Sequence, residues 1–244
     1  MALTIRIILV VLILLGAAAL IGSYTFLPPS LGAMVGRGVQ RDVGLADTPN
    51  VELKSQPPPN MLAGKFSQGR IDMGEFDLGG GVRLNRVTID LDPFDVDVIG
   101  SVTSGALKSE KPLSGDMRAE LSEKAVTDIA RSRIKQFPVK GVDLEKDSVR
   151  VSSQIELLGL AVPVSVEGGL KARDNALTFE PRSERAFGVP IPKGITDSLL
   201  AGTDFTYPLD GLPYDTQITG VELQKDRMIL TGKAKRISLG GSGS

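Results

Sequence analysis

The side chains of this chain that could do acid–base chemistry are carboxylates, hydroxyls and amines, because its 244 residues include no histidine and no cysteine. These absences remove thiol nucleophiles, the usual zinc ligands and every Ser-His or Cys-His catalytic pair. The densest acidic cluster is formed by Asp90, Asp92, Asp95 and Asp97. An EF-hand calcium loop needs its oxygen ligands around a glycine turn and a closing glutamate. Here the carboxylates alternate with apolar residues, which predicts the solvent-facing side of strands and no metal site.

Two other motifs resemble catalytic or phosphate-binding signatures. Ser132-Arg133-Ile134-Lys135 matches the S-x-x-K motif of penicillin-interacting enzymes, but the accompanying S-D-N and K-T-G elements are absent. Ser132 also falls near the end of a predicted helix, where the helix dipole does not favour an anion. Gly79-Gly80-Gly81 lacks the Lys-Ser/Thr that follows a phosphate loop, and it predicts a hairpin turn. We therefore expect no catalytic residues and no cofactor.

The charge balance gives no electrostatic case for nucleic-acid binding, because 28 basic and 29 acidic residues leave a net charge of −1. Lys124, Arg131, Lys135 and Lys140 place basic groups on and just after one face of a predicted helix. They could meet anionic lipid headgroups, or form an ordinary solvated face partly paired with Asp128. The second interpretation is favoured because such faces are common.

The N-terminal part of the chain is apolar. No charged residue occurs from Ile7 to Gly36, and residues 7–27 are mostly Ile, Leu, Val and Ala. Since a membrane-spanning helix needs about 20 such residues, residues 1–30 are predicted to be a membrane anchor. The alternative is a signal peptide cleaved near Ala17-Ala18-Ala19, but the apolar character continues beyond that point. We expect a single-pass protein of the cell membrane with its main domain outside the cytoplasm, because long domains translocate largely regardless of charge.

The remaining chain divides by composition into three parts. Residues 31–60 are rich in Pro and Gly and end in Pro57-Pro58-Pro59, which predicts an extended stalk. Residues 61–239 are predicted to form one folded domain. Residues 240–244 are a Gly/Ser linker that we exclude from the fold.

Apolar residues recur with a period of two through most of the predicted domain, which indicates β-strands. Three turn sites lie between alternating stretches and predict antiparallel hairpins: Lys146-Asp147, Arg173-Asp174-Asn175 and Lys225-Asp226. The strands expected from the pattern are Ile71–Met73, Phe76–Leu78, Val87–Leu91, Phe94–Val98, Val149–Leu157, Val162–Val166 and Leu177–Phe179.

One amphipathic helix interrupts the strands. Ser122 is its predicted N-cap, its apolar arc extends from Val126 to Phe137, and Pro138 ends it. A shorter helix is predicted at residues 195–200. The fold class is therefore α+β: a long curved antiparallel β-sheet, in meander order, wrapped on one main amphipathic helix.

Five segments spread over residues 50–239 carry a family resemblance. They are Leu62-Ala63-Gly64-Lys65, GGGVRLNRVTIDLDPFDVDV at 79–98, SGDMRAELSEKAVTDIA at 114–130, the strand pair from Val149 to Val166, and GVELQKDRMILTGKAKRI at 220–237. In layout and turn spacing the chain resembles the LmeA-like lipid-binding family of bacterial envelope proteins, which is distantly similar to the tubular lipid-binding proteins. The resemblance implies a curved sheet around a helix, an apolar groove and phospholipid binding. It offers no catalytic residues to carry over.

These observations predict a non-enzymatic protein that binds, transfers or presents phospholipid in an apolar groove between sheet and helix. Its expected partners are membrane phospholipid, the cytoplasmic membrane and a protein of envelope biosynthesis. One alternative is a membrane-anchored scaffold in which the same residues form a solid core. A weaker one is a glycosidase with paired carboxylates, for which a chain without Trp is poorly equipped. The candidate lining residues are Val126, Ile129, Ile134 and Phe137 from the helix, and Phe94, Val96, Val98, Val162, Val164 and Val166 from the strands.

Overall fold

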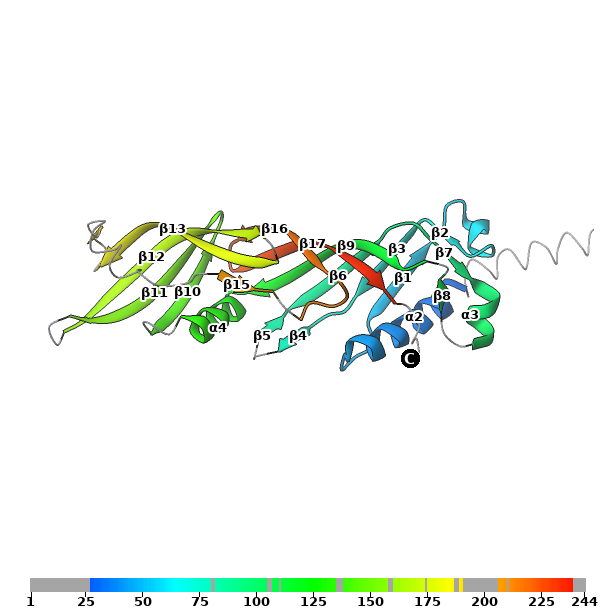
Figure 1. Cartoon of the computed structure of the whole chain (residues 1–244), viewed down its shortest axis with the longest axis horizontal. Coiled ribbons are helices and arrows are strands. Elements are labelled where there is room, and N and C mark those ends of the chain that lie inside the picture. The colour runs from blue at the N-terminus through cyan, green and yellow to red at the C-terminus, as the bar shows by residue number, and fades with distance from the viewer. Residues whose placement is uncertain are drawn as a thin grey trace, which may run out of the picture. The chain divides into compact units, whose positions relative to one another are not determined.

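The chain forms two compact units in a computed structural model (Figure 1). Unit 1 takes its residues from Met1–Met73, Ile89–Gly115 and Lys235–Ser244, and unit 2 from Gly74–Thr88 and Asp116–Ala234. The structure describes residues 27–79, 82–104, 107–109, 111–134, 138–157, 160–173, 175–186, 189–190, 206–209 and 211–238.

Strands greatly outnumber helices in the part of the chain that the structure describes. The helices are α2 (Leu27–Val43), the short 3-10 helix η1 (Pro58–Met61), α3 (Val98–Ser104) and α4 (Glu123–Arg133). The strands are β1 (Asn50–Lys54), β2 (Lys65–Phe66), β3 (Gln68–Asp72), β4 (Phe76–Gly79), β5 (Val82–Leu84), β6 (Arg86–Leu91), β7 (Phe94–Asp97), β8 (Lys108–Ser109), β9 (Leu113–Ser122), β10 (Val139–Glu145), β11 (Ser148–Leu157), β12 (Leu160–Arg173), β13 (Ala176–Ala186), β14 (Val189–Pro190), β15 (Thr206–Pro208), β16 (Gln217–Gln224) and β17 (Arg227–Ile237).

The strands are mostly antiparallel, which confirms a sheet-dominated α+β class. One six-stranded sheet has the order β10-β11-β12-β13-β14, with β15 also pairing with β13, and this sheet is the predicted meander. The other six-stranded sheet has the order β1-β3-β6-β9-β17-β16 and is not a meander. The segments between its first four strands form the small sheets β2-β7-β8 and β4-β5, and the other six-stranded sheet lies in sequence between β9 and β16. The prediction of one long sheet was therefore wrong, since a period of two identifies strands but not their order.

The three predicted hairpin turns are confirmed. Asp147, Asn175 and Asp226 have φ values of 65°, 59° and 64°, and they connect β10 to β11, β12 to β13 and β16 to β17. Asp and Asn tolerate this left-handed region better than other side chains, which explains their use here. Strands β4 and β5 on either side of the glycine run also pair as a hairpin. Gly80 and Gly81 themselves lie outside the described residues.

The predicted stalk at residues 31–60 is folded. Helix α2 buries Leu31, Val35 and Val39 in unit 1, and β1 and η1 follow it. Its glycines serve close packing: a Cβ at Gly32 would lie 2.6 Å from the Val51 carbonyl oxygen, and one at Gly36 would lie 2.9 Å from that of Pro49. Gly32 and Gly36 therefore allow close packing of the helix, and the segment is not an extended linker.

Helix α4 is confirmed at its start and is shorter than predicted at its end. The Ser122 hydroxyl accepts a hydrogen bond from the Ala125 N–H at 3.3 Å, as an N-cap does. The helix ends at Arg133, and Ile134 is extended, with φ −83° and ψ 103°. The Ile134 N–H still donates to the Ala130 carbonyl at 2.8 Å, so Ile134 stays attached to the last turn.

No helix among the described residues is long and apolar enough to cross a membrane. Of the predicted anchor, residues 1–26 lie outside the described residues, so the anchor stays a prediction. The predicted helix at 195–200 and the linker at 240–244 also lie outside them.

Candidate functional site

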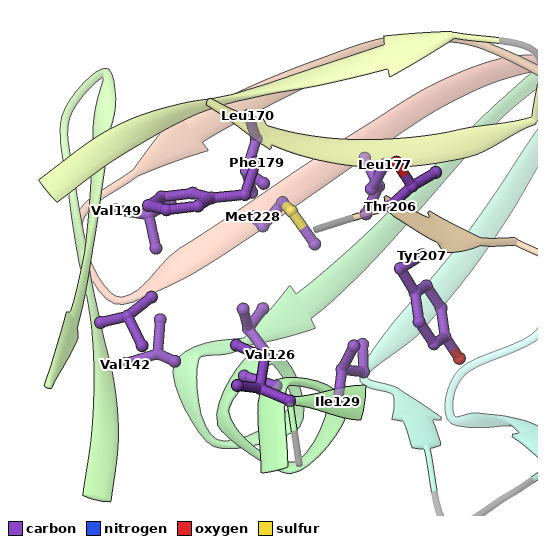
Figure 2. A pocket seen from close by; sticks show the side chains of 13 residues that line it. Val126, Ile129, Val142, Val149, Leu170, Leu177, Phe179, Thr206, Tyr207 and Met228 are labelled. Atoms are coloured by element: carbon purple, nitrogen blue, oxygen red, sulfur yellow. The ribbon is translucent and has the colours of Figure 1, made fainter. Parts of the chain in front are cut away.

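Unit 2 contains an apolar cavity between helix α4 and the β10–β13 sheet (Figure 2). Its volume is about 90 Å³. Figure 2 shows Val126 and Ile129 of α4 on one side and Leu170, Phe179 and Met228 on the other. The full lining is Val126, Ile129, Ala130, Ile134, Val142, Val149, Val151, Leu170, Leu177, Phe179, Thr206, Tyr207 and Met228.

Helix α4 lies at the edge of this sheet and is held there by side chains spaced four residues apart. Glu123, Thr127 and Arg131 share one face of the helix. A carboxylate oxygen of Glu123 accepts from the Leu144 N–H at 2.9 Å, and the Thr127 hydroxyl accepts from the Val142 N–H at 3.1 Å. We call these three residues the α4 ladder.

The third residue of the α4 ladder bonds to carbonyls instead of amides. The Arg131 guanidinium donates to the Val139 carbonyl at 3.2 Å and to the Lys140 carbonyl at 2.6 Å. Strand β10 is the edge of its sheet, so these backbone groups have no neighbouring strand to pair with on that side. The α4 ladder therefore forms the hydrogen bonds to β10 that a neighbouring strand would form. Arg131, one of the basic residues considered for lipid headgroups, is bonded to the backbone of β10 in this way.

The start of α4 is fixed by hydrogen bonds to two segments that connect strands. The Ser122 N–H donates to the Asn85 side chain at 2.8 Å, and the Glu123 N–H donates to the Asp226 carbonyl at 3.2 Å. The Asp226 N–H in turn donates to the Leu144 carbonyl at 3.1 Å. The helix is thus held at its start and along one face, which leaves its apolar face over the cavity.

The opposite wall is built from residues that follow the three positive-φ turns. Val149 comes two positions after Asp147, Leu177 two after Asn175, and Met228 two after Asp226. Val151 and Phe179, two positions further on, also line the cavity because alternate residues of a strand share a face. The hairpin turns therefore set which residues face the cavity.

The side of the cavity formed by β15 depends on Asn175. Its side-chain amide donates to the Thr216 carbonyl at 2.9 Å, and its amide oxygen accepts from the Ile218 N–H at 2.7 Å. The Asn175 carbonyl accepts from the Leu209 N–H at 2.8 Å. These bonds hold the β12–β13 turn against Leu209, Thr216 and Ile218. The turn lies beside the pairs Leu177–Tyr207 and Thr178–Thr206.

A glycine in β12 makes room for the aromatic ring in the wall. Leu170 and Phe179 are direct partners across β12 and β13, and Gly168 lies two residues before Leu170. A Cβ at Gly168 would lie 2.7 Å from the Phe179 ring. The ring therefore lies over the bare backbone of Gly168, and a side chain there would push it away.

Among the described residues, no charged side chain lines the cavity. Thr206 and Tyr207 are the lining residues with polar side-chain atoms, and no Asp, Glu, Lys or Arg lines it. The Ser132 hydroxyl of the S-x-x-K motif donates to the Ile129 carbonyl at 2.8 Å and does not line the cavity. What the arrangement can do is exclude water from an apolar group.

The acidic run is on the exposed side of its strands, as predicted. Asp90 pairs with Arg70 at 2.6 Å, and Asp92 accepts from the Ser114 hydroxyl at 2.6 Å. Asp97 accepts from the Gly100 N–H at 2.9 Å and so caps α3. Within the described residues no cluster of Asp and Glu could hold a metal ion.

The structure brings together some of the predicted lining residues and separates others. Val126, Ile129 and Ile134 line the cavity. Val162 is buried in β12, and Val164 and Val166 are half-buried there, outside the lining. Phe137 lies outside the described residues.

The three predicted residues from the Phe94–Val98 stretch belong to unit 1 and do not line this cavity. Phe94 and Val96 are buried in β7, where the Phe94 ring stacks on Phe66 with centroids 5.1 Å apart. Val98 begins α3. Alternation of apolar residues predicts that one face of a strand is buried. It does not predict which unit of the protein that face belongs to.

The sequence did not predict as lining residues those that follow the turns, nor Leu170, Thr206 and Tyr207. The first group could have been found, because Val149, Leu177 and Met228 share their offset from Asp147, Asn175 and Asp226. Thr206 and Tyr207 carry no such signal, since they reach the cavity only through the pairing of β15 with β13.

A comparison with protein-family models shows to which family the chain is related. The model of the LmeA-like phospholipid-binding family matches residues 29–233, which is most of the chain. The chain belongs to this family. Neither the curated proteins nor the solved structures gave a match. The LmeA-like match includes every residue that lines the cavity and every residue of the α4 ladder.

Proposed function

We propose that this protein binds phospholipid without catalysing a reaction, and that the cavity of unit 2 takes part of one acyl chain. The observation that carries the proposal is the lining, which is apolar and free of charged groups, in a member of a phospholipid-binding family. A charged headgroup would lose its hydration in such a cavity without gaining a partner, so only the tail suits it.

The size of the cavity supports a segment of one chain and not a whole lipid. Its volume of about 90 Å³ is several times the roughly 10–15 Å³ that one water needs. It is well below the roughly 300–1,000 Å³ of pockets that enclose drug-sized ligands. Each methylene that the cavity shelters from water would contribute about 0.8 kcal/mol.

The rest of the chain would lie along the β11–β12 face that continues from the cavity. Val151 of the lining pairs directly with Val166, so the two side chains share one face of the sheet. Val164, the buried Val162 and Leu160 follow on that face because alternate residues point the same way. Leu160 is 70% exposed, which leaves apolar surface available for a lipid tail.

We also propose that residues 7–27 anchor the protein in the cytoplasmic membrane, with the folded part outside the cytoplasm. The support is the charge-free apolar run, which has the length that a membrane span needs. A fusion of alkaline phosphatase after Leu45 should be active, because that enzyme requires export. Activity only of a cytoplasmic reporter at the same position would contradict this placement.

Lipid binding is tested by native mass spectrometry of the full chain, followed by uptake of a fluorescent phosphatidylcholine. We expect co-purified phospholipid and saturable uptake. Ala130→Trp should reduce uptake severalfold because Ala130 lines the cavity and the larger side chain would fill it. Ser132→Trp is the matched control, since Ser132 is exposed on the same helix.

Two results would contradict the proposal. A chain without bound lipid that takes up none would indicate a membrane-anchored scaffold. Equal loss of uptake in both tryptophan variants would mean that the cavity is not where the tail binds.

A further inference from the structure

Unit 1 exposes two large apolar side chains on neighbouring segments. Leu62, just after η1, is 50% exposed, and Ile99, in the first turn of α3, is 79% exposed. The segments touch: the Val96 N–H donates to the Gly64 carbonyl at 2.8 Å, and a Cβ at Gly64 would lie 3.3 Å from a Val98 methyl. We call Leu62 and Ile99 the apolar pair.

The exposure of the apolar pair is set by rigid local structure. Ser101 of α3 is fully buried, donates its hydroxyl to the Asp97 carbonyl and accepts from the Lys108 N–H at 2.9 Å. This ties α3 to β7 and β8 and turns Ile99 outward. Gly64 has φ 75° and lies directly against β7, which fixes the turn that carries Leu62.

The apolar pair lies at the end of unit 1 where α2 begins. Figure 1 shows the start of α2, coloured the darkest blue, at the same end of unit 1 as α3 and the strands β2, β7 and β8. The helix packs closely on the unit, because Gly32 lies against the carbonyl of Val51 in β1 and Gly36 against that of Pro49 just before it. Leu27, the last residue of the apolar run, is the first residue of α2.

We propose that this end of unit 1 rests on the bilayer that holds the N-terminal apolar run, with Leu62 and Ile99 inserted between the headgroups. The proposal rests on the membrane anchoring proposed above and is independent of lipid binding in unit 2. Lys65 of β2 and Lys108 of β8 are exposed beside β7 and suit contact with headgroup phosphates.

The absence of tryptophan from the chain allows a direct test. Ile99→Trp and Leu62→Trp each place one fluorophore at the proposed contact, and Arg41→Trp places one on the exposed side of α2 near its other end. Arg41 is about 21 Å along the helix from Leu27. Each full-length variant is reconstituted into phosphatidylcholine vesicles whose chains are brominated close to the headgroup, and vesicle flotation measures attachment.

In floating samples we expect the tryptophans of I99W and L62W to be quenched severalfold more than that of R41W and to emit at shorter wavelength. Quenching of I99W and L62W no greater than that of R41W would overturn the proposal. Failure of the wild-type chain to float would overturn the anchoring and this proposal together. Lipid uptake measured on the same variants reports separately on the cavity of unit 2, and it should be unchanged in all three.

Discussion

Helices α2 and α4 both lie against an edge strand of a sheet, but they approach it in different ways. In unit 1, Gly32 lets α2 contact the backbone of β1 directly, Gly36 brings it against Pro49 just before that strand, and Leu31, Val35 and Val39 are buried. In unit 2, the α4 ladder holds the helix to β10 through side chains, and the apolar face beside the ladder borders a cavity. Glycine contact thus gives solid packing, whereas attachment through longer side chains leaves a space.

The largest effect is expected where the contact is tightest. Gly32→Val would place a branched side chain 2.6 Å from a backbone carbonyl that cannot move without displacing β1. We expect the free energy of unfolding to fall by about 3 kcal/mol, the upper end of overpacking effects, in urea unfolding followed by circular dichroism. Ala33→Val, on the exposed side of the same helix, is the control and should cost less than about 0.7 kcal/mol. Equal stability of the two variants would disprove the close contact.

The second largest loss of stability is expected at Thr127, the buried residue of the α4 ladder. Thr127→Val keeps the shape of the side chain but leaves the buried Val142 N–H without its acceptor. This should lower the free energy of unfolding by about 2 kcal/mol and speed hydrogen exchange of the Val142 amide. Thr127→Ser retains the hydroxyl and should keep that amide protected. Fast exchange in both variants would show that the hydroxyl does not hold this edge.

The exposed end of the ladder should matter least. Arg131→Lys keeps the charge but cannot donate to two carbonyls in the fixed geometry of a guanidinium. Because the Arg131 side chain is 51% exposed, we expect a loss below about 1 kcal/mol. A loss as large as that of Thr127→Val would mean that burial does not decide how much each residue of the α4 ladder contributes to stability. The measurement is the same urea series.

The resemblance in layout and turn spacing predicted the family, and the match over residues 29–233 confirmed it. The turn residues and the Ser122 cap were also correct, because their signals are local: a backbone conformation or a single hydrogen bond. Helix α2 was missed because glycines at positions 32 and 36 lower helix propensity when read alone. Their purpose becomes visible only when β1 lies against them.

By itself, the sequence determined which residues alternate between two faces of a strand, where hairpins turn and where α4 begins. These properties depend on neighbours within a few positions. Only the tertiary structure decided that α4 lies at the edge of β10, that residues after three separate turns face one cavity, and that Phe94 and Val96 belong elsewhere. Those outcomes depend on which strands pair across long stretches of chain, and alternation is the same for every pairing order.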